Sequence, residues 1–313
     1  MNEVHVSFQS DVELRGSLVF PEQKVSTDTF PAVLLLHGSG PVDRDENAKM
    51  GKINAFKLLS DAIVPHGFAV LRYDKRGVGE SKGNYHEAGL SDLVADADAA
   101  LTFLKAHPNI DKERVFLLGH SEGCTLAVLL QKQQAVKGLI LLAGAAESLK
   151  TTVMRQGEFF ARDFKEMTGL KGALFRFLKV PNKIAKQQRN LIERIEQSTE
   201  PVIRVKGQKV NAKWMKEHFA YNVRDDLKHI TCPILAITGS KDVQVLPEHA
   251  KVFADGVSGE AEHLIIENMN HLLRHQEEDA NILSLKQVYK RSFRKPLEPK
   301  IIKAILDWLK KYT

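Results

Sequence analysis

Apolar and polar residues alternate along the chain in two different periods, which predict strands and helices in turn. Eight short runs rich in Val, Ile, Leu or Phe predict strands: Val4–Phe8, Val12–Phe20, Ala32–Leu36, Ala69–Tyr73, Val115–Leu118, Gly138–Leu142, Ile234–Thr238 and Glu262–Ile266. Segments with apolar residues three and four positions apart predict helices: Lys52–Pro65, Ser91–Ala106, Glu122–Lys132, Pro247–Val257 and Pro299–Tyr312. This order is typical of an α/β fold, with a mostly parallel eight-stranded sheet flanked by helices and an antiparallel pair at its start.

The alternation is interrupted once, over residues 146–228, where helical patterns continue without a strand–helix unit. A structureless loop of that length is improbable in a compact domain. We therefore expect an α/β core formed by residues 1–145 and 229–313, with residues 146–228 inserted as a helical cap, or lid. We also expect the aromatic side chains of this insertion to line a substrate pocket. The alternative is that the insertion is a helical decoration on one edge of the sheet.

A G-x-S-x-G motif lies between the fifth predicted strand and the helix that follows it, and it reads Gly119-His120-Ser121-Glu122-Gly123. In this position the serine occupies a sharp, strained turn that lifts its hydroxyl above the sheet. Gly119 and Gly123 are needed because side chains there would clash with the turn. The helix N-terminus directs backbone amides toward developing negative charge. The motif therefore predicts Ser121 as a nucleophile.

A serine nucleophile requires a base, and the base requires an orienting carboxylate. In the α/β-hydrolase fold these follow the serine in the order acid, then histidine, each at a strand end. Asp242 follows the strand Ile234–Thr238, and His271 follows the strand Glu262–Ile266. Glu147 is an alternative acid. His275, four residues after His271, would allow a metal pair, but no third ligand has suitable spacing, so we expect no metal site.

Stabilisation of a tetrahedral oxyanion needs two backbone N–H donors. We expect the first from Glu122, the residue after the nucleophile, and the second from the loop His37-Gly38-Ser39-Gly40-Pro41, which follows the third strand. Glycine lets this backbone approach a ligand closely. We assign the second donor to Ser39, with Gly40 as the alternative. We expect His37 to act as a hydrogen-bonded brace of the loop.

Taken together, these segments resemble the bacterial α/β-hydrolase carboxylesterases of the EstD-like family. The resemblance rests on five segments outside residues 146–228: His37–Glu46, Leu71–Ser81, Gly119–Gly123, Gly239–Asp242 and Asn270–Leu272. It implies a serine esterase acting on short acyl chains, with Ser121, Asp242 and His271 as the triad and no metal or organic cofactor. One position departs from the family pattern, because Cys124 stands where a further glycine is frequent. The charged residues of Asp43–Glu46 and Arg72–Arg76 are interpreted as a structural network.

Charge and composition narrow the list of partners. The chain of 313 residues has a formal net charge of +6, and the segment 150–228 alone has 18 Lys and Arg against 9 Asp and Glu. No nucleic-acid-binding motif accompanies this charge, so we expect a solvated basic face and no nucleic-acid partner. No apolar run approaches the length of a membrane span, and two cysteines imply no disulfide framework. With no secretory signal at the N-terminus, we expect a cytoplasmic protein without a membrane partner.

The sequence therefore predicts a serine hydrolase that cleaves a small-molecule acyl ester of short to medium chain length. Thioester and peptide cleavage remain open, because all three acyl substrates share one type of tetrahedral intermediate. A non-catalytic ligand-binding protein on the same scaffold is the alternative from a different class. The natural substrate and the oligomeric state are not encoded in any pattern that we identify.

Overall fold

The computed structural model describes residues 1–22, 29–49, 51–281 and 283–313 and contains one large sheet. Its eight strands have the spatial order β1-β2-β4-β3-β5-β6-β9-β10. Their bounds are β1 Asn2–Gln9, β2 Glu13–Phe20, β3 Phe30–Leu36, β4 Ala69–Tyr73, β5 Ile110–His120, β6 Gly138–Leu142, β9 Ile234–Gly239 and β10 Ala261–Ile266. The pairs β1–β2 and β2–β4 are antiparallel, and every other pair in this sheet is parallel. The predicted fold class is confirmed.

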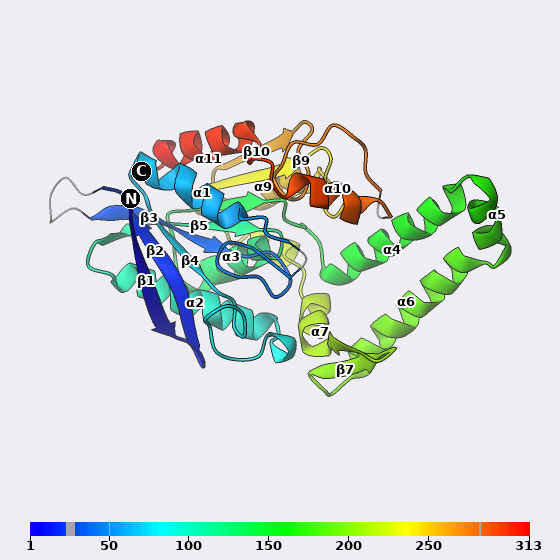
Figure 1. The fold of residues 1–313 in the computed structure, drawn as a ribbon. Helices are drawn as coiled ribbons and strands as arrows, with labels where there is room; N and C mark the ends of the chain where they lie inside the picture. Colours follow the sequence, from blue (N-terminus) through cyan, green and yellow to red (C-terminus); the bar gives the residue numbers. More distant parts are fainter. Residues whose placement is uncertain (23–28, 50, 282) are drawn as a thin grey trace.

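Helices cover both faces of the sheet (Figure 1). On one face lie α1 (Ala55–Ile63) and α11 (Pro299–Lys311). On the other lie α2 (Leu90–Ala106), α3 (Glu122–Gln133) and α9 (His249–Gly256). Strands β3, β4, β6 and β9 are buried along their whole length, which explains why their sequences are nearly continuous apolar runs.

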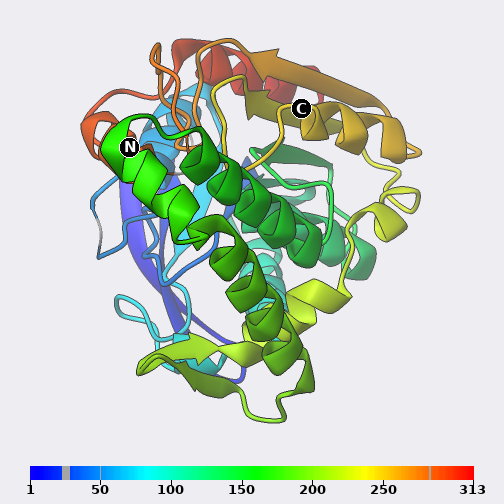
Figure 2. The same ribbon diagram turned by 90° about the vertical axis from the view of Figure 1, so that its right-hand side faces the viewer.

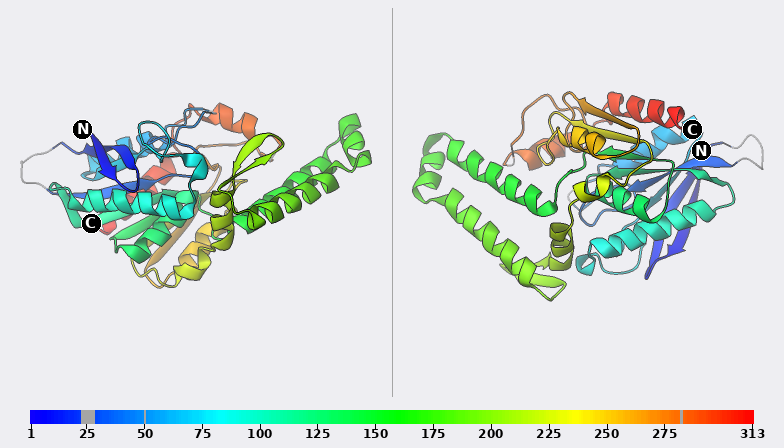
Figure 3. Two further views of the ribbon diagram at one scale, coloured as in Figure 1. Left: turned by 90° about the horizontal axis from the view of Figure 1, so that it is seen from below. Right: turned by 180° about the vertical axis from the view of Figure 1, so that it is seen from behind.

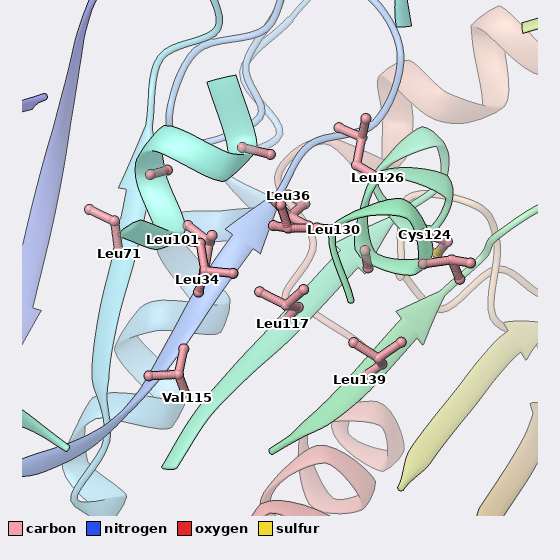
Figure 4. Close-up of a cluster of buried hydrophobic side chains, with 14 of the residues drawn as sticks. Leu34, Leu36, Leu71, Leu101, Val115, Leu117, Cys124, Leu126, Leu130 and Leu139 are labelled. Atoms are coloured by element: carbon pink, nitrogen blue, oxygen red, sulfur yellow. The ribbon is translucent and has the colours of Figure 1, made fainter. Parts of the chain in front are cut away.

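Alternation along the strands divides the core between the two faces. In β3, Leu34 and Leu36 face α2 and α3, whereas Val33 and Leu35 face α1 and α11. Figure 4 shows part of the first cluster, including Cys124 on α3 beside the apolar side chains of β3 and β5. A Cβ atom added to Gly144 would lie 2.6 Å from the Cys124 sulfur. The larger residue at position 124 is thus matched by a glycine at position 144.

The segment between β6 and β9 leaves the sheet as a set of helices with one hairpin, and its later residues Val223 and Leu227 belong to the core cluster on the α2 and α3 face. Its elements are α4 (Leu149–Glu166), α5 (Gly169–Phe177), α6 (Val180–Gln197), β7 (Val202–Val205), β8 (Gln208–Asn211), α7 (Ala212–Ala220) and α8 (Arg224–Leu227). Helix α4 leads away from the sheet, α5 lies at the far end and α6 returns (Figures 1 and 2). The antiparallel hairpin β7–β8 adds strands to a segment that we expected to be helical.

Two short 3-10 helices, Val64–His66 and Tyr85–Glu87, and the helix α10 (Leu285–Ser292) complete the regular structure. Within the described ranges, no helix combines the length and the apolar content needed to cross a bilayer.

Candidate active site

Ser121 lies at the sharp turn between β5 and α3, at the carboxyl edge of the sheet. Its backbone has φ 53° and ψ −114°, a conformation that is strained for a residue with a side chain. Its amide donates a hydrogen bond to the carbonyl of Leu142, 2.8 Å away, which anchors the turn to β6. A Cβ atom on Gly119 would lie 2.3 Å from the Gly123 carbonyl oxygen, and one on Gly123 would lie 1.9 Å from the Leu36 oxygen. Only glycine fits on either side of the serine.

His271 and Asp242 lie beside Ser121 although they come from two other loops. The Nε2 atom of His271 is 3.2 Å from the Ser121 hydroxyl oxygen, and its Nδ1 atom is 2.7 Å from Oδ2 of Asp242. The other carboxylate oxygen of Asp242 accepts hydrogen bonds from the amides of Gln244 and Val245, each 2.9 Å long. The proton on Nδ1 is therefore fixed by Asp242, which leaves Nε2 able to accept the proton of the serine.

Glu147 and His275, which the sequence offered as an alternative acid and a candidate metal ligand, have other partners. Glu147, the alternative acid, accepts hydrogen bonds from Thr152 and Arg155 at 2.8 and 2.6 Å and makes no contact with His271. His275 points toward the Glu298 carboxylate, with Nδ1 3.2 Å from Oε2. Among the described residues, no group of three or more His, Cys, Asp or Glu side chains could hold a metal ion.

The loop after β3 passes close to Ser121, and its two candidate N–H donors differ in their partners. The amide of Gly40 donates to the hydroxyl of Tyr85, 2.9 Å away. The amide of Ser39 has no hydrogen-bond partner in the part of the chain that the structure describes. Ser39 also lines both hollows that reach Ser121. This difference favours Ser39 over Gly40 as the free donor.

His37 differs from our expectation of a hydrogen-bonded brace. Its buried ring packs between Phe56 and Tyr73, with centroid distances of 5.3 and 4.8 Å. Neither ring nitrogen has a hydrogen-bond partner among the described residues. Burial and the nearby Lys75 cation lower the pKa of His37 to about 4. A neutral ring therefore braces the loop through packing.

Behind the site, His120 connects the histidine loop to the loop after β3. Its Nδ1 atom is 2.7 Å from Oε1 of Glu46, and its Nε2 atom is 2.9 Å from the His271 carbonyl. The same Glu46 oxygen accepts a 2.8 Å hydrogen bond from the Gly38 amide. Both neighbours of the ring are acceptor groups, so this arrangement favours a proton on each nitrogen, the imidazolium form. Burial opposes this charge, but Glu46 holds the pKa of His120 above its ordinary value.

On the side of Ser121 that faces the insertion, the buried Glu122 carboxylate lies close to nitrogen groups of the core and of the insertion. The Lys75 ammonium lies 2.7 Å from Oε2 of Glu122 and also donates to the Gly38 carbonyl at 2.6 Å. From α7, the Trp214 indole N–H donates to Oε1 at 2.6 Å, and Nε2 of His218 lies 2.9 Å from the same oxygen. Burial would raise the pKa of Glu122, but Lys75 and His218 hold it well below its usual range.

Two hollows meet at Ser121 and His271. The first has a volume of about 170 Å³ and extends toward the insertion. Its lining comes from the loops that follow β3, β6, β9 and β10, from the serine turn with α3, and from α4, α7 and the residues after α7: Ser39, Ser121, Glu122, Thr125, Ala145, Glu147, Leu149, Thr152, Gln156, Trp214, His218, Tyr221, Val223, Gln244, Val245 and His271. The second has a volume of about 430 Å³ and is bordered by α10, including Tyr289.

The expectation about the aromatic residues of the insertion holds only in part. Trp214 lines the first hollow, but Phe159, Phe160 and Phe164 of α4 do not, and Phe160 borders a separate hollow between α4 and α6. Phe219 packs instead into a small apolar cluster within the insertion.

A family model described as Hydrolase_4, serine aminopeptidase, S33, matches residues 49–279 of this chain. The chain belongs to this family. The match includes the serine turn, Asp242 and His271, and leaves the loop after β3 outside.

Among curated proteins, Esterase EstD of Thermotoga maritima is 27% identical over 263 residues, covering 83% of this chain and 58% of EstD. An uncharacterized protein of Mycobacterium tuberculosis is 33% identical over 139 residues, covering 44% of each chain. The chain thus spans less than two thirds of the length of these relatives. The resemblance to EstD-like esterases is confirmed.

Solved structures support the fold. Est1E of Butyrivibrio proteoclasticus, determined with ferulic acid bound, covers 98% of both chains with a TM-score of 0.63 and 16% identity. The Pyrococcus furiosus esterase Pf2001 covers 99% of this chain and 91% of its own, with a TM-score of 0.60 and 16% identity. At these identities the likeness concerns the fold alone.

Proposed function

We propose that this chain is a serine hydrolase that cleaves carboxylic esters of short to medium acyl chain length. The observation that carries the proposal is the chain of contacts from the Ser121 hydroxyl through His271 to Asp242, at 3.2 and 2.7 Å. A strained serine, a correctly oriented imidazole and a buried carboxylate are the parts that acyl transfer requires.

In the proposed reaction, His271 removes the Ser121 proton while the serine oxygen attacks the acyl carbonyl carbon. The oxyanion accepts hydrogen bonds from the backbone amides of Glu122 and Ser39. His271 then donates its proton to the leaving alcohol, and the acyl group stays on Ser121. A water molecule, deprotonated by His271, then attacks the carbonyl carbon of this ester. The bond to the Ser121 oxygen breaks, His271 returns the proton to that oxygen, and the acid is released. No step requires a metal or an organic cofactor.

The insertion, residues 146–228, acts in this proposal as a cap on the core formed by residues 1–145 and 229–313. Support comes from the first hollow, whose wall includes Leu149, Thr152 and Trp214 from the insertion. The cap therefore limits the size of the group that enters from this side.

Charge pairing in the hollow favours an ester over an aminopeptidase substrate. A buried substrate ammonium needs an unpaired carboxylate as its partner. The two carboxylates that line the first hollow already have cations, since Glu122 pairs with Lys75 and Glu147 pairs with Arg155 at 2.6 Å. A neutral acyl or alcohol group requires no such partner.

The test compares wild type with Ser121→Ala on p-nitrophenyl esters from acetate to palmitate. Loss of the serine is expected to reduce turnover by roughly 10⁶-fold. A fluorophosphonate probe should label wild type and leave Ser121→Ala unlabelled. Full esterase activity in Ser121→Ala would refute the mechanism. Faster turnover of a thioester or an aminoacyl anilide with the same acyl group would replace the ester as the proposed substrate class. Absence of fluorophosphonate labelling in wild type would indicate a non-catalytic binding protein.

A further inference from the structure

Helix α5, at the far end of the insertion, has an apolar face that stays exposed in the part of the chain that the structure describes. Leu170, Leu174, Phe177 and Leu178 are spaced at i, i+4, i+7 and i+8, which places them on one side of a helix. A hydrogen bond from the Leu178 amide to the Leu174 carbonyl, 2.9 Å long, extends the helical turn to Leu178. The four residues are 92, 52, 83 and 45% exposed. We call them the α5 tip.

The surrounding sequence is strongly basic. Residues 167–192 contain six Lys and Arg and no Asp or Glu. Exposed Leu and Phe on one face of a helix, with Lys and Arg around them, are typical of helices that lie in the interface of a lipid bilayer. Basic residues near an anionic bilayer surface add attraction.

The position of α5 suits such a contact. The insertion projects from the sheet, and α5 is its most distant element (Figure 3, left). Helix α4 has 18 residues and is therefore about 27 Å long. Its first residues, Leu149 and Thr152, line the first hollow beside Ser121. The α5 tip can thus meet a flat surface while the core and Ser121 stay away from it.

We propose that the α5 tip docks this chain on anionic lipid bilayers. A second copy of the α5 tip is disfavoured, because the two basic segments would repel each other. Nucleic acid would use the positive charge but not Leu170, Leu174 and Leu178, since binding to single strands relies on aromatic stacking. This proposal departs from our sequence-based expectation of no membrane partner, which rested on the lack of a run long enough to span a bilayer and of a secretory signal.

The first experiment is co-sedimentation of the full chain with vesicles of phosphatidylcholine, with and without phosphatidylglycerol. Wild type should bind the anionic vesicles, bind neutral vesicles weakly and dissociate at high salt. Leu170→Ser with Phe177→Ser should lower the partition coefficient about 100-fold, since each apolar side chain contributes on the order of a tenfold factor. Val4→Ser, at an exposed valine of β1, is the matched control and should bind like wild type.

A second variant pair tests the charge. Lys179→Gln with Lys183→Gln should weaken binding about 25-fold at low salt, because each basic residue near the surface contributes about a fivefold factor. Lys251→Gln with Lys303→Gln removes two exposed cations from the core and should have no effect. Phe177→Trp reports insertion directly, since its fluorescence should be quenched by brominated lipids beyond that of the native tryptophans.

Several outcomes would overturn the docking. These are absent binding to anionic vesicles, equal loss in the core variants, and no quenching of Phe177→Trp. Retention on RNA without vesicle binding, or a dimer that Phe177→Ser dissociates, would assign the α5 tip to another partner. Ser121→Ala should still bind vesicles, so failure of docking and failure of the proposed hydrolysis are distinguishable.

Discussion

Lys75 neutralises a carboxylate that is otherwise enclosed by the protein. Its side chain and that of Glu122 are 2 and 4% exposed and lie 2.7 Å apart. Removing one partner of a buried ion pair leaves an uncompensated charge, which costs about 3–5 kcal/mol. We expect Lys75→Met to lower the free energy of unfolding in urea by this amount.

Two further variants serve as controls for this measurement. Glu122→Gln in the Lys75→Met background should recover part of the lost free energy of unfolding, because the carboxylate that lost its Lys75 partner is then replaced by a neutral amide. Lys57→Met breaks the exposed pair with Asp61 and should cost only about 0.3–0.5 kcal/mol. Equal free energies of unfolding for Lys75→Met and Lys57→Met would show that the buried pair of Lys75 and Glu122 contributes little to stability.

The His120–Glu46 pair gives stability a defined dependence on pH. The pKa of His120 is raised, so its contribution is complete below the ordinary value of 6.5 and is lost as pH rises through the raised pKa. The pKa of Glu46 is lowered, so its contribution is lost as pH falls through that lower value. The difference in the free energy of unfolding between wild type and Glu46→Gln should therefore be largest at pH values between the lowered pKa of Glu46 and the raised pKa of His120. Histidine NMR should show the His120 midpoint shifted down in Glu46→Gln, and an unchanged midpoint would contradict the pairing.

Asp242 and Glu147 can be separated as candidates for the orienting acid. Asp242→Asn should reduce kcat about 10⁴-fold, because the amide no longer fixes the proton on Nδ1 of His271. Glu147→Gln should cost far less, since Glu147 interacts with Arg155 and Thr152 instead. The measurement is turnover of p-nitrophenyl acetate, with thermal unfolding as the control for folding. Similar losses in both variants would argue against the assignment of Asp242.

Sequence order could indicate which residues meet at the strand ends, but not which side chains support them. Ser121, Asp242 and His271 each follow a parallel strand, and parallel strands end at one edge of the sheet. Lys75 and Glu46 belong to charged runs that we interpreted as a structural network. Arg44 does pair with Asp74 at 2.6 Å, as that interpretation implies. The spacing of residues in the sequence does not distinguish Lys75 and Glu46, which contact the loop after β3, from the other charged residues of these runs. Their contacts depend on the tertiary fold.

At the level of elements, the buried strands were predictable and the small exposed elements were not. Each of the eight strands of the large sheet overlaps one of the predicted runs, although β1 and β10 are largely exposed and β5 begins five residues before its apolar run, at Ile110. The hairpin β7–β8 was missed although Lys206 and Gly207 both have positive φ, 50° and 82°, as a two-residue hairpin turn requires. The available signal was the β-branched run Val202–Val205, which reads Val-Ile-Arg-Val, followed by Lys-Gly. Helix α10 was missed because it is short and mostly polar, with Val288 as its buried apolar residue.

Helix α7 connects the insertion to the core through polar contacts that one variant can weaken selectively. The Trp214 indole donates to Glu122, while Lys213 pairs with Asp92 and Glu217 accepts from the Ser91 amide. Trp214→Phe keeps an aromatic side chain, smaller than the indole, and removes one hydrogen bond to a charged acceptor, which contributes about 1.5–3 kcal/mol. We expect faster amide hydrogen exchange in α7 and a lower kcat/KM for the esters.

Lys213→Met provides the comparison for Trp214→Phe, because it weakens the attachment of α7 without touching Glu122. It should loosen α7 while changing kcat/KM less. Unchanged exchange in Trp214→Phe would show that the other contacts hold α7 without the indole.

For the whole molecule, the apolar clusters show that the projecting part of the insertion and the core are stabilised separately. Ile192, Ile195 and Ile203 form a cluster of the insertion together with Ala212 and Phe219 of α7. Trp214 and Tyr221 pack instead against the main core cluster on the α2 and α3 face. The boundary between the core and the insertion therefore runs through α7. One face of this helix packs in the cluster of the insertion, and another packs against the core.

This division predicts that the projecting part can be removed without loss of the core. Replacing residues 150–210, which include α5, α6 and all of α4 except Leu149, with a short Gly-Ser linker removes no residue of the two core clusters and neither Ser121 nor His271. We expect the shortened chain to unfold cooperatively and to react with a fluorophosphonate at Ser121. Because Leu149, Thr152 and Gln156 wall the first hollow, their removal or exposure should broaden the range of acyl chains toward longer p-nitrophenyl esters. The ratio of kcat/KM for palmitate to that for acetate measures this change. An unaltered ratio in a folded, probe-reactive chain would mean that the core alone sets acyl selectivity and that the insertion does not act as a cap.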